Sequence, residues 1–179
     1  MSHHLIWIDL EMTGVNPEKD FILEIATIVT NDELELVAEG PCLAINYPEA
    51  VLSDMEEWSR THHQASGLTD RVKASPHDCG QAEQKTLDFL RVHCRERQSP
   101  LCGNSIWQDR RFLAKHMPML HEFFHYRTID VSSVKELVNR WYPSFPRFEK
   151  EKAHLALTDI KESISELQYY REKIFRPQG

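Results

Sequence analysis

Two carboxylates, Asp9 and Glu11, lie two positions apart at the end of the apolar run 5–8. Such a run is typical of a buried strand, in which alternate side chains point to the same face. Like charges this close are unfavourable unless a cation lies between them, and carboxylate oxygens are the ligands of hard divalent metals. The pattern therefore predicts a metal site, and the other interpretation is a pair of surface acids at a strand end.

Two further acids and a histidine fall later in the chain. Asp109 follows one turn into a helix expected to begin at Ser105, and Asp159 lies near the start of the last helix. His154 precedes Asp159 by five residues, which at about 100° per helical residue places the two roughly 140° apart. His154 must therefore leave the helical path, on the proline-broken basic loop before it, if both serve one site.

Four acids and one histidine suit a two-metal phosphodiester cleavage site. The carboxylates would hold two divalent ions about 3.5–4 Å apart, which activate water and stabilise the leaving oxygen. His154, with an ordinary pKa near 6.5, would take the proton from the attacking water. A mobile loop would let it close over bound substrate.

The elements that must position these residues follow from hydrophobic periodicity and turn signals. Strands first, joined by short turns, then strands alternating with helices, predict an α/β domain with a mixed sheet. The sheet begins with an antiparallel meander and is flanked by helices, and we expect a single domain over 1–179. The expected strands are 5–11, 21–29, 34–44, 101–102 and 127–129, and the expected helices fall within 48–66, 82–94, 105–117, 131–141 and 157–174.

Net charge, hydropathy and cysteine spacing limit the partners and the compartment that we expect for this protein. The formal net charge is −7, which disfavours coating of long nucleic acid but not a short phosphodiester in a pocket where metals supply positive charge. No apolar stretch reaches membrane-spanning length, and we expect no membrane partner. The four cysteines lack metal-binding spacing, which predicts a reduced, cytoplasmic protein with the cysteines as small buried residues.

Three segments carry a family resemblance. They are 8–14 (IDLEMTG), 103–113 (GNSIWQDRRFL) and 154–160 (HLALTDI). The chain resembles the DEDD-type exonucleases, in the subgroup with a histidine base that acts on very short RNA. The resemblance implies a ribonuclease-H-like exonuclease fold, a homodimer, two Mg²⁺ or Mn²⁺ ions, and 3′-to-5′ hydrolysis of short oligoribonucleotides to mononucleotides. It also implies that the four acids are metal ligands and that His154 is the general base.

The same resemblance implies a grip on the substrate's terminal phosphate. The residues are Tyr126, Arg127, Ser132 and Ser133, with Tyr126 and Arg127 reaching in from the partner subunit. A guanidinium binds phosphate in a fork, and Tyr126 would stack on a base or orient the attacking water. The alternatives are a surface ion pair for Arg127 and a capping box formed by Ser133 and Glu136.

The remaining substrate contacts are expected around the strand end and the helices. Ser105 fits either a capping box with Gln108 or a phosphate contact at a helix N-terminus. Trp58 is either core or a stacking platform for a base. By resemblance, His63 is a substrate contact and Val15, where leucine is commoner, a wedge against the bases. The set expected to bind substrate also contains Met12 and Thr13.

The sequence therefore predicts a metal-dependent exoribonuclease that acts on oligomers as short as dinucleotides. One alternative is a related exonuclease that trims the 3′ ends of longer RNA or DNA, which would need a basic track leading to the site. Another is a metal-dependent module that binds nucleotides without hydrolysis. One departure from the family pattern is Thr158, where a second acid is common; Asp159 keeps its register.

Overall fold

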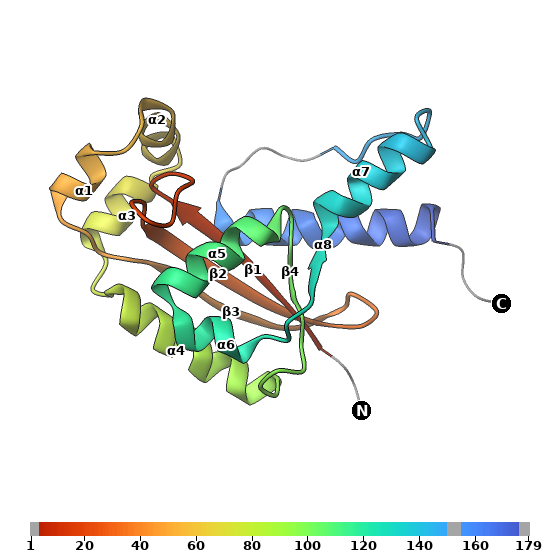
Figure 1. Cartoon of the computed structure of the whole chain (residues 1–179), viewed down its shortest axis with the longest axis horizontal. Helices are drawn as coiled ribbons and strands as arrows, with labels where there is room; N and C mark the ends of the chain where they lie inside the picture. Colours follow the sequence, from red (N-terminus) through yellow and green to blue (C-terminus); the bar gives the residue numbers. More distant parts are fainter. Residues whose placement is uncertain (1–3, 150–154, 176–179) are drawn as a thin grey trace.

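The computed structural model describes residues 4–149 and 155–175, and its centre is a five-stranded sheet (Figure 1). The strands lie in the order β3-β2-β1-β4-β5. The first three pair antiparallel, whereas β4 and β5 continue the sheet in parallel with β1. The predicted mixed sheet with an N-terminal meander is confirmed. The strand bounds are β1 His4–Met12, β2 Ile22–Asn31, β3 Leu36–Ala44, β4 Leu101–Gly103 and β5 Thr128–Asp130.

The helices agree with the periodicity except at two short elements that the sequence analysis missed. One begins after Gly67, whose φ of 71° supplies the left-handed turn. The other begins at Pro118, which ends the preceding helix but suits the first position of a new one. The bounds are α1 Glu49–Ser53, α2 Glu57–Ala65, α3 Leu68–Ala74, α4 Cys79–His93, α5 Ile106–His116, α6 Pro118–Phe123, α7 Val131–Trp141 and α8 Ala156–Lys173.

The two faces of β1 belong to different cores. Ile6, Ile8 and Leu10 pack with residues of α4, α5 and α6, whereas Leu5 and Trp7 pack with residues of α7 and α8. Because side chains alternate along a strand, the odd positions 9 and 11 continue the α8 face. Figure 1 shows the N-terminal end of α8 near the end of β1. The fold thus carries acids of β1 toward the first turn of α8.

Two sequence expectations concern the cysteines and membranes. All four cysteines are free, but only Cys102 is buried and Cys42 is exposed, so their expected role as buried apolar residues holds in part. Within residues 4–149 and 155–175, no helix is both long enough and apolar enough to cross a bilayer.

Candidate metal centre and substrate site

Three carboxylates converge where β1 ends. Asp9 and Glu11 come from β1, and Asp159 comes from the first turn of α8. One ligand oxygen from each lies within 4.8 Å of the other two, and all three residues are half-buried. Hard oxygen ligands that close are suited to a divalent cation. Strand alternation and the docking of α8 together produce this cluster.

Asp109 approaches the same strand from the opposite face. It lies in the first turn of α5, and its neighbours Ile106 and Phe112 pack into the other core. Its Oδ1 accepts a hydrogen bond of 3.0 Å from the main-chain N–H of Leu10. The fourth acid, only 7% exposed, therefore holds the backbone between the two acids of β1. It is not a member of the group of three whose oxygens lie within 4.8 Å.

Burial, with nearby negative charge as a smaller cause, raises the pKa of two of the acids. The pKa of Glu11 is raised to about 8, first by burial and then by the charges of Asp159, Glu24 and Asp109. Burial also raises the pKa of Asp109 to about 7, against the lowering effect of the hydrogen bond from Leu10. A bound cation would reverse these shifts by favouring the ionised forms. The donor set therefore fits a divalent metal.

Sequence reasoning missed the ion pair behind Glu11. Glu24 lies directly opposite Glu11 in the β1–β2 ladder and is almost fully buried. Arg71 of α3 reaches its Oε1 at 2.9 Å, and the charge of Arg71 lowers the pKa of Glu11. A charged residue inside the apolar strand at 22–29 was the available signal, since buried acids are usually paired.

We expect the metal-free protein to lose stability as pH rises from about 5 to 8. Glu11 binds its proton more tightly when folded, with a pKa of about 8 against an ordinary 4.5. The folded state therefore holds the extra proton in this window, and its advantage disappears as pH passes the folded pKa. The share of this loss due to Glu11 should be about 3 kcal/mol, because each pKa unit corresponds to about 1.4 kcal/mol, and Asp109, whose pKa is raised to about 7, adds a loss of the same sign. Thermal unfolding in EDTA at pH 5 and pH 8 measures it.

Two controls separate the effect of Glu11 from the rest of the protein. Glu11→Gln should reduce the pH dependence of stability, leaving the part due to Asp109. Mn²⁺ should restore stability at pH 8, since a ligand that binds only the folded state stabilises it. An unchanged slope in Glu11→Gln would show that other groups cause the loss.

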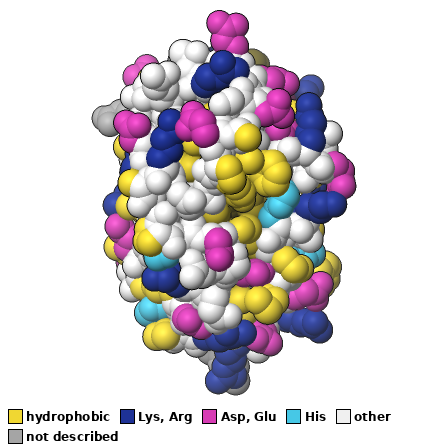
Figure 2. Space-filling view, turned by 90° about the vertical axis from the view of Figure 1, so that its left-hand side faces the viewer, with side chains coloured by type: hydrophobic (Ala, Val, Ile, Leu, Met, Phe, Trp, Pro, Cys, Tyr) yellow, Lys and Arg dark blue, Asp and Glu magenta, His cyan; other side chains and the backbone are white. Residues whose placement is uncertain are grey.

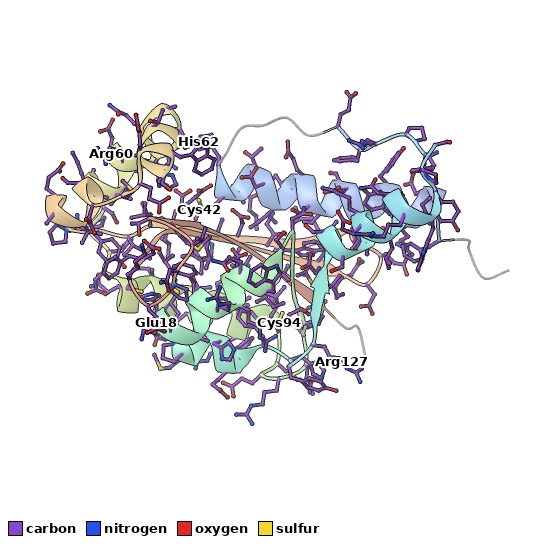
Figure 3. All side chains as sticks on the ribbon, turned by 45° about the horizontal axis from the view of Figure 1, so that its top comes forward. Glu18, Cys42, Arg60, His62, Cys94 and Arg127 are labelled. Atoms are coloured by element: carbon purple, nitrogen blue, oxygen red, sulfur yellow. The ribbon has the colours of Figure 1, made fainter. Side chains whose placement is uncertain are left out.

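Helix α2 brings a histidine and an exposed aromatic beside the acids. Nε2 of the buried His63 lies 2.8 Å from the carbonyl oxygen of Met12, and its Nδ1 lies 3.8 Å from Glu11 Oε2. Burial lowers the pKa of His63. Trp58 is 70% exposed and stacks on His62 with ring centroids 4.5 Å apart, so its interpretation as core is wrong. Figure 3 shows His62 beside the N-terminal end of α8.

The loop after β1 presents Val15 to solvent. The side chain is 75% exposed, and its carbonyl oxygen accepts a hydrogen bond of 2.6 Å from Gln108 of α5. The buried Thr13 donates to the carboxylate of Asp20, which closes the loop. A Cβ on Gly14 would lie 2.6 Å from that carboxylate, so the close approach requires glycine. The loop is thus a fixed rim beside the acids, anchored to α5.

Both predicted capping boxes are wrong. Ser105 has a φ of 51° and its side chain makes no capping hydrogen bond to α5. Helix α7 is capped by Asp130, which accepts from the N–H of Ser132, so the exposed Ser133 lies inside the helix. The exposed Ser105 instead contacts Ser132, with 3.2 Å between the two hydroxyl oxygens. Two of the three expected phosphate-binding serines are therefore adjacent.

Tyr126 and Arg127 lie far from the acids of their own chain. Tyr126 is 72% exposed, and the Arg127 guanidinium lies 5.3 Å from its ring centroid. Thr128 of β5 pairs with Leu101 of β4, and Leu101 pairs with Ile6 of β1, so Thr128 lies at the height of Ile6 along the strands. Tyr126 is thus about seven strand positions from Glu11, on the order of 20 Å. Figure 3 shows Arg127 at the end of the molecule opposite His62.

His154 lies outside the described residues. The described part of the chain resumes at Leu155, which is the N-cap of α8. Placement of His154 at the entrance to this helix, and its role as a base, therefore stay predictions.

An acidic cluster where the first strand of a mixed sheet meets the last helix is typical of nucleases with a ribonuclease-H-like fold. The family model described as "Exonuclease" (RNase_T) matches residues 6–167. Two solved structures share the fold: exonuclease I of E. coli in an ssDNA complex, at TM-score 0.77 and 14% identity, and exonuclease I of Methylocaldum szegediense, at 0.73 and 16%. They cover 98% and 97% of this chain, which spans only 42% and 41% of theirs.

Curated relatives narrow the class. Oligoribonuclease of Alcanivorax borkumensis is 58% identical over 95% of this chain and 94% of its own. Oligoribonuclease of Shewanella loihica is 57% identical over 97% of this chain and 96% of its own. The chain belongs to the oligoribonuclease family of exonucleases. The resemblance drawn from the three sequence segments is confirmed.

Proposed function

We propose that this chain is a 3′-to-5′ exoribonuclease that hydrolyses short oligoribonucleotides, down to dinucleotides, to mononucleotides. The observation that carries the proposal is the convergence of Asp9, Glu11 and Asp159 within 4.8 Å at the end of β1. The exposed Trp58 on α2 and the exposed Val15 rim offer apolar surfaces for bases beside it. Relatives named oligoribonuclease support RNA as the substrate.

We assign the four acids to two divalent ions, Mg²⁺ or Mn²⁺. Bound ions would supply Lewis-acid activation of the scissile phosphate and of the attacking water. Asp9, Glu11 and Asp159 would be the ligands whose oxygens already converge, and Asp109 would be the fourth ligand while its Oδ1 also accepts from the N–H of Leu10. His154 accepts the proton of the water as its oxygen bonds to phosphorus. The P–O3′ bond breaks, and the leaving 3′ oxygen takes up a proton.

The terminal phosphate is assigned to residues from two subunits. Ser105, Ser132 and Ser133 come from the same chain as the acids. Tyr126 and Arg127 come from the partner in a homodimer, because within one chain they lie on the order of 20 Å from Glu11. His63, whose Nδ1 lies 3.8 Å from Glu11 Oε2, is assigned to substrate binding together with Met12 and Thr13 at the end of β1.

Subunit mixing tests this shared site. Arg127→Ala and Asp9→Asn should each be inactive alone, because every site lacks one essential group. Mixed one to one with subunit exchange, half of the dimers are heterodimers and each has one intact site, so about a quarter of wild-type activity returns. Dinucleotide turnover before and after mixing is the measurement.

The matched control pairs Asp9→Asn with Asp109→Ala. Both changes damage the acids of one chain, so no mixed dimer contains an intact site and no activity returns. Full activity of Arg127→Ala alone, or no recovery on mixing it with Asp9→Asn, would contradict the shared site.

A length series tests the function itself. We expect kcat/KM to be higher for a two-residue RNA than for a twenty-residue RNA, with all turnover lost in EDTA. An enzyme that trims long strands is expected to carry a continuous basic track for the phosphates. Figure 2 instead shows acidic and basic side chains interspersed over the viewed face. Preference for the longer RNA would indicate a trimming exonuclease, and binding without product release would indicate a nucleotide-binding module.

We place this enzyme in the cytoplasm. All four cysteines are free, including the exposed Cys42, and free thiols persist where the compartment is reducing. An enzyme that degrades RNA fragments is also expected in the compartment in which RNA is made and degraded.

A further inference from the structure

A polar network lies beneath the site, where β4, α7 and α8 meet. Its centre is Glu166 of α8, which is completely buried. Lys135 of α7 pairs with Glu166 Oε1 at 2.9 Å, and the Tyr170 hydroxyl donates to the same oxygen at 3.0 Å. Glu166 Oε2 accepts from Asn104 Nδ2 at 3.3 Å. A buried carboxylate is thus held by three elements at once.

Asn104 uses both ends of its side-chain amide. Its Oδ1 accepts from Ser132 Oγ at 3.0 Å, and its Nδ2 donates to Ser163 Oγ at 2.7 Å. Ser163 donates its own hydroxyl proton to the main-chain carbonyl of Asp159 at 2.7 Å. Ser163 and the Glu166 carboxylate can therefore only accept from the amide, which fixes its orientation.

This chain of contacts joins two parts of the proposed site. On one side, Ser132 Oγ accepts from the N–H of Ser105, the adjacent phosphate-binding serine. On the other side, Ser163 holds the turn of α8 that carries Asp159. A buried ion pair is weak evidence for stability, because desolvation offsets its attraction. Its value here is geometric: one amide links a phosphate contact to a metal ligand.

We propose that Asn104, oriented by Glu166, is a positioning residue that sets the spacing between the terminal-phosphate contact and Asp159. The inference rests on the proposed function. A 3′-to-5′ enzyme keeps the free 3′ end of its substrate at the acids, so the terminal phosphate at Ser105 and Ser132 belongs to the 5′ end. A dinucleotide with a 5′ phosphate is therefore the substrate that probes this spacing.

The test compares kcat/KM for a dinucleotide with and without its 5′ phosphate. Asn104→Asp keeps the shape but loses both N–H donors, and Ser163→Ala cuts only the link to Asp159. Each should reduce the preference for the 5′-phosphorylated substrate at least tenfold. Tyr170→Phe is the control, because it removes one hydrogen bond to the same buried carboxylate but leaves Asn104 and Ser163 joined. It should lower Tm and leave the preference unchanged.

The outcomes separate the two claims. A wild-type protein that does not cleave either dinucleotide refutes the proposed function and, with it, this inference. A cleaving wild type whose Asn104→Asp and Ser163→Ala variants keep the preference refutes the positioning role alone. An equal loss of preference in Tyr170→Phe also refutes it, since the network would then act only through general stability. If Asn104→Asp fails to fold, Ser163→Ala with its control decides.

Discussion

Asp159→Asn is expected to lower kcat for a dinucleotide by about 10³-fold while making the metal-free protein more stable. The amide keeps the shape but removes one of three charges whose oxygens lie within 4.8 Å. Loss of one electrostatic group at a reacting centre costs about 10²- to 10³-fold, and loss of a metal ligand adds weaker metal binding, so the expected effect is at the upper end of this range. Without metal, the same change relieves the repulsion from Asp159 that adds to burial in raising the pKa of Glu11. Single-turnover kinetics and thermal unfolding in EDTA measure the two effects.

A fall in kcat together with a rise in metal-free stability would distinguish a metal ligand from a residue that only supports the fold. Glu172→Gln makes the same charge change at an exposed position of the same helix, so it should alter neither quantity appreciably. Mn²⁺ titration of Asp159→Asn should also show weaker binding. Wild-type turnover in Asp159→Asn, or a fall in metal-free stability, would remove Asp159 from the assigned site.

His154→Ala is expected to lower kcat by about 10²- to 10⁴-fold, the usual contribution of a positioned general base. Only the neutral imidazole accepts a proton, so wild-type kcat should rise with pH through the region near 6.5. The variant should lose that rise, and added imidazole should restore part of its activity. Kinetics from pH 5.5 to 8.5 with both proteins are the measurement.

Metal binding provides the internal check on this histidine. His154→Ala should bind Mn²⁺ with wild-type affinity, because the assigned ligands are carboxylates. His77→Ala serves as the matched substitution of a histidine that lies on the loop before α4, away from the assigned roles. A pH profile that keeps its shape in His154→Ala would mean that another group accepts the proton.

Local patterns were enough to predict β1 and the side of the sheet that its acids face. The apolar run before Asp9 gives the strand, and the period of two places Glu11 on the same face. The helix stripe containing Ile160 and Ile164 gives α8, and hence the approach of Asp159. Both predictions use only the spacing of apolar residues within one element, which the sequence shows directly.

Other features depend on tertiary structure that periodicity does not contain. The bond from Leu10 to Asp109 requires α5 to pack on the second face of the sheet. Ser105 matches a capping box by spacing, but its left-handed φ of 51° turns the side chain toward Ser132 instead. Glu24 and Glu166 are charges inside apolar patterns, and their partners Arg71 and Lys135 are distant in sequence.

The hydrogen bond between the Leu10 amide and the Asp109 carboxylate gives a way to measure local opening of the protein. The amide proton of Leu10 is bonded to a side chain of α5, so its exchange with deuterium requires a local opening between the helix and the sheet. Backbone isotope exchange at Leu10 would thus report, in the absence of any nucleotide, the free energy of local opening between α5 and the sheet.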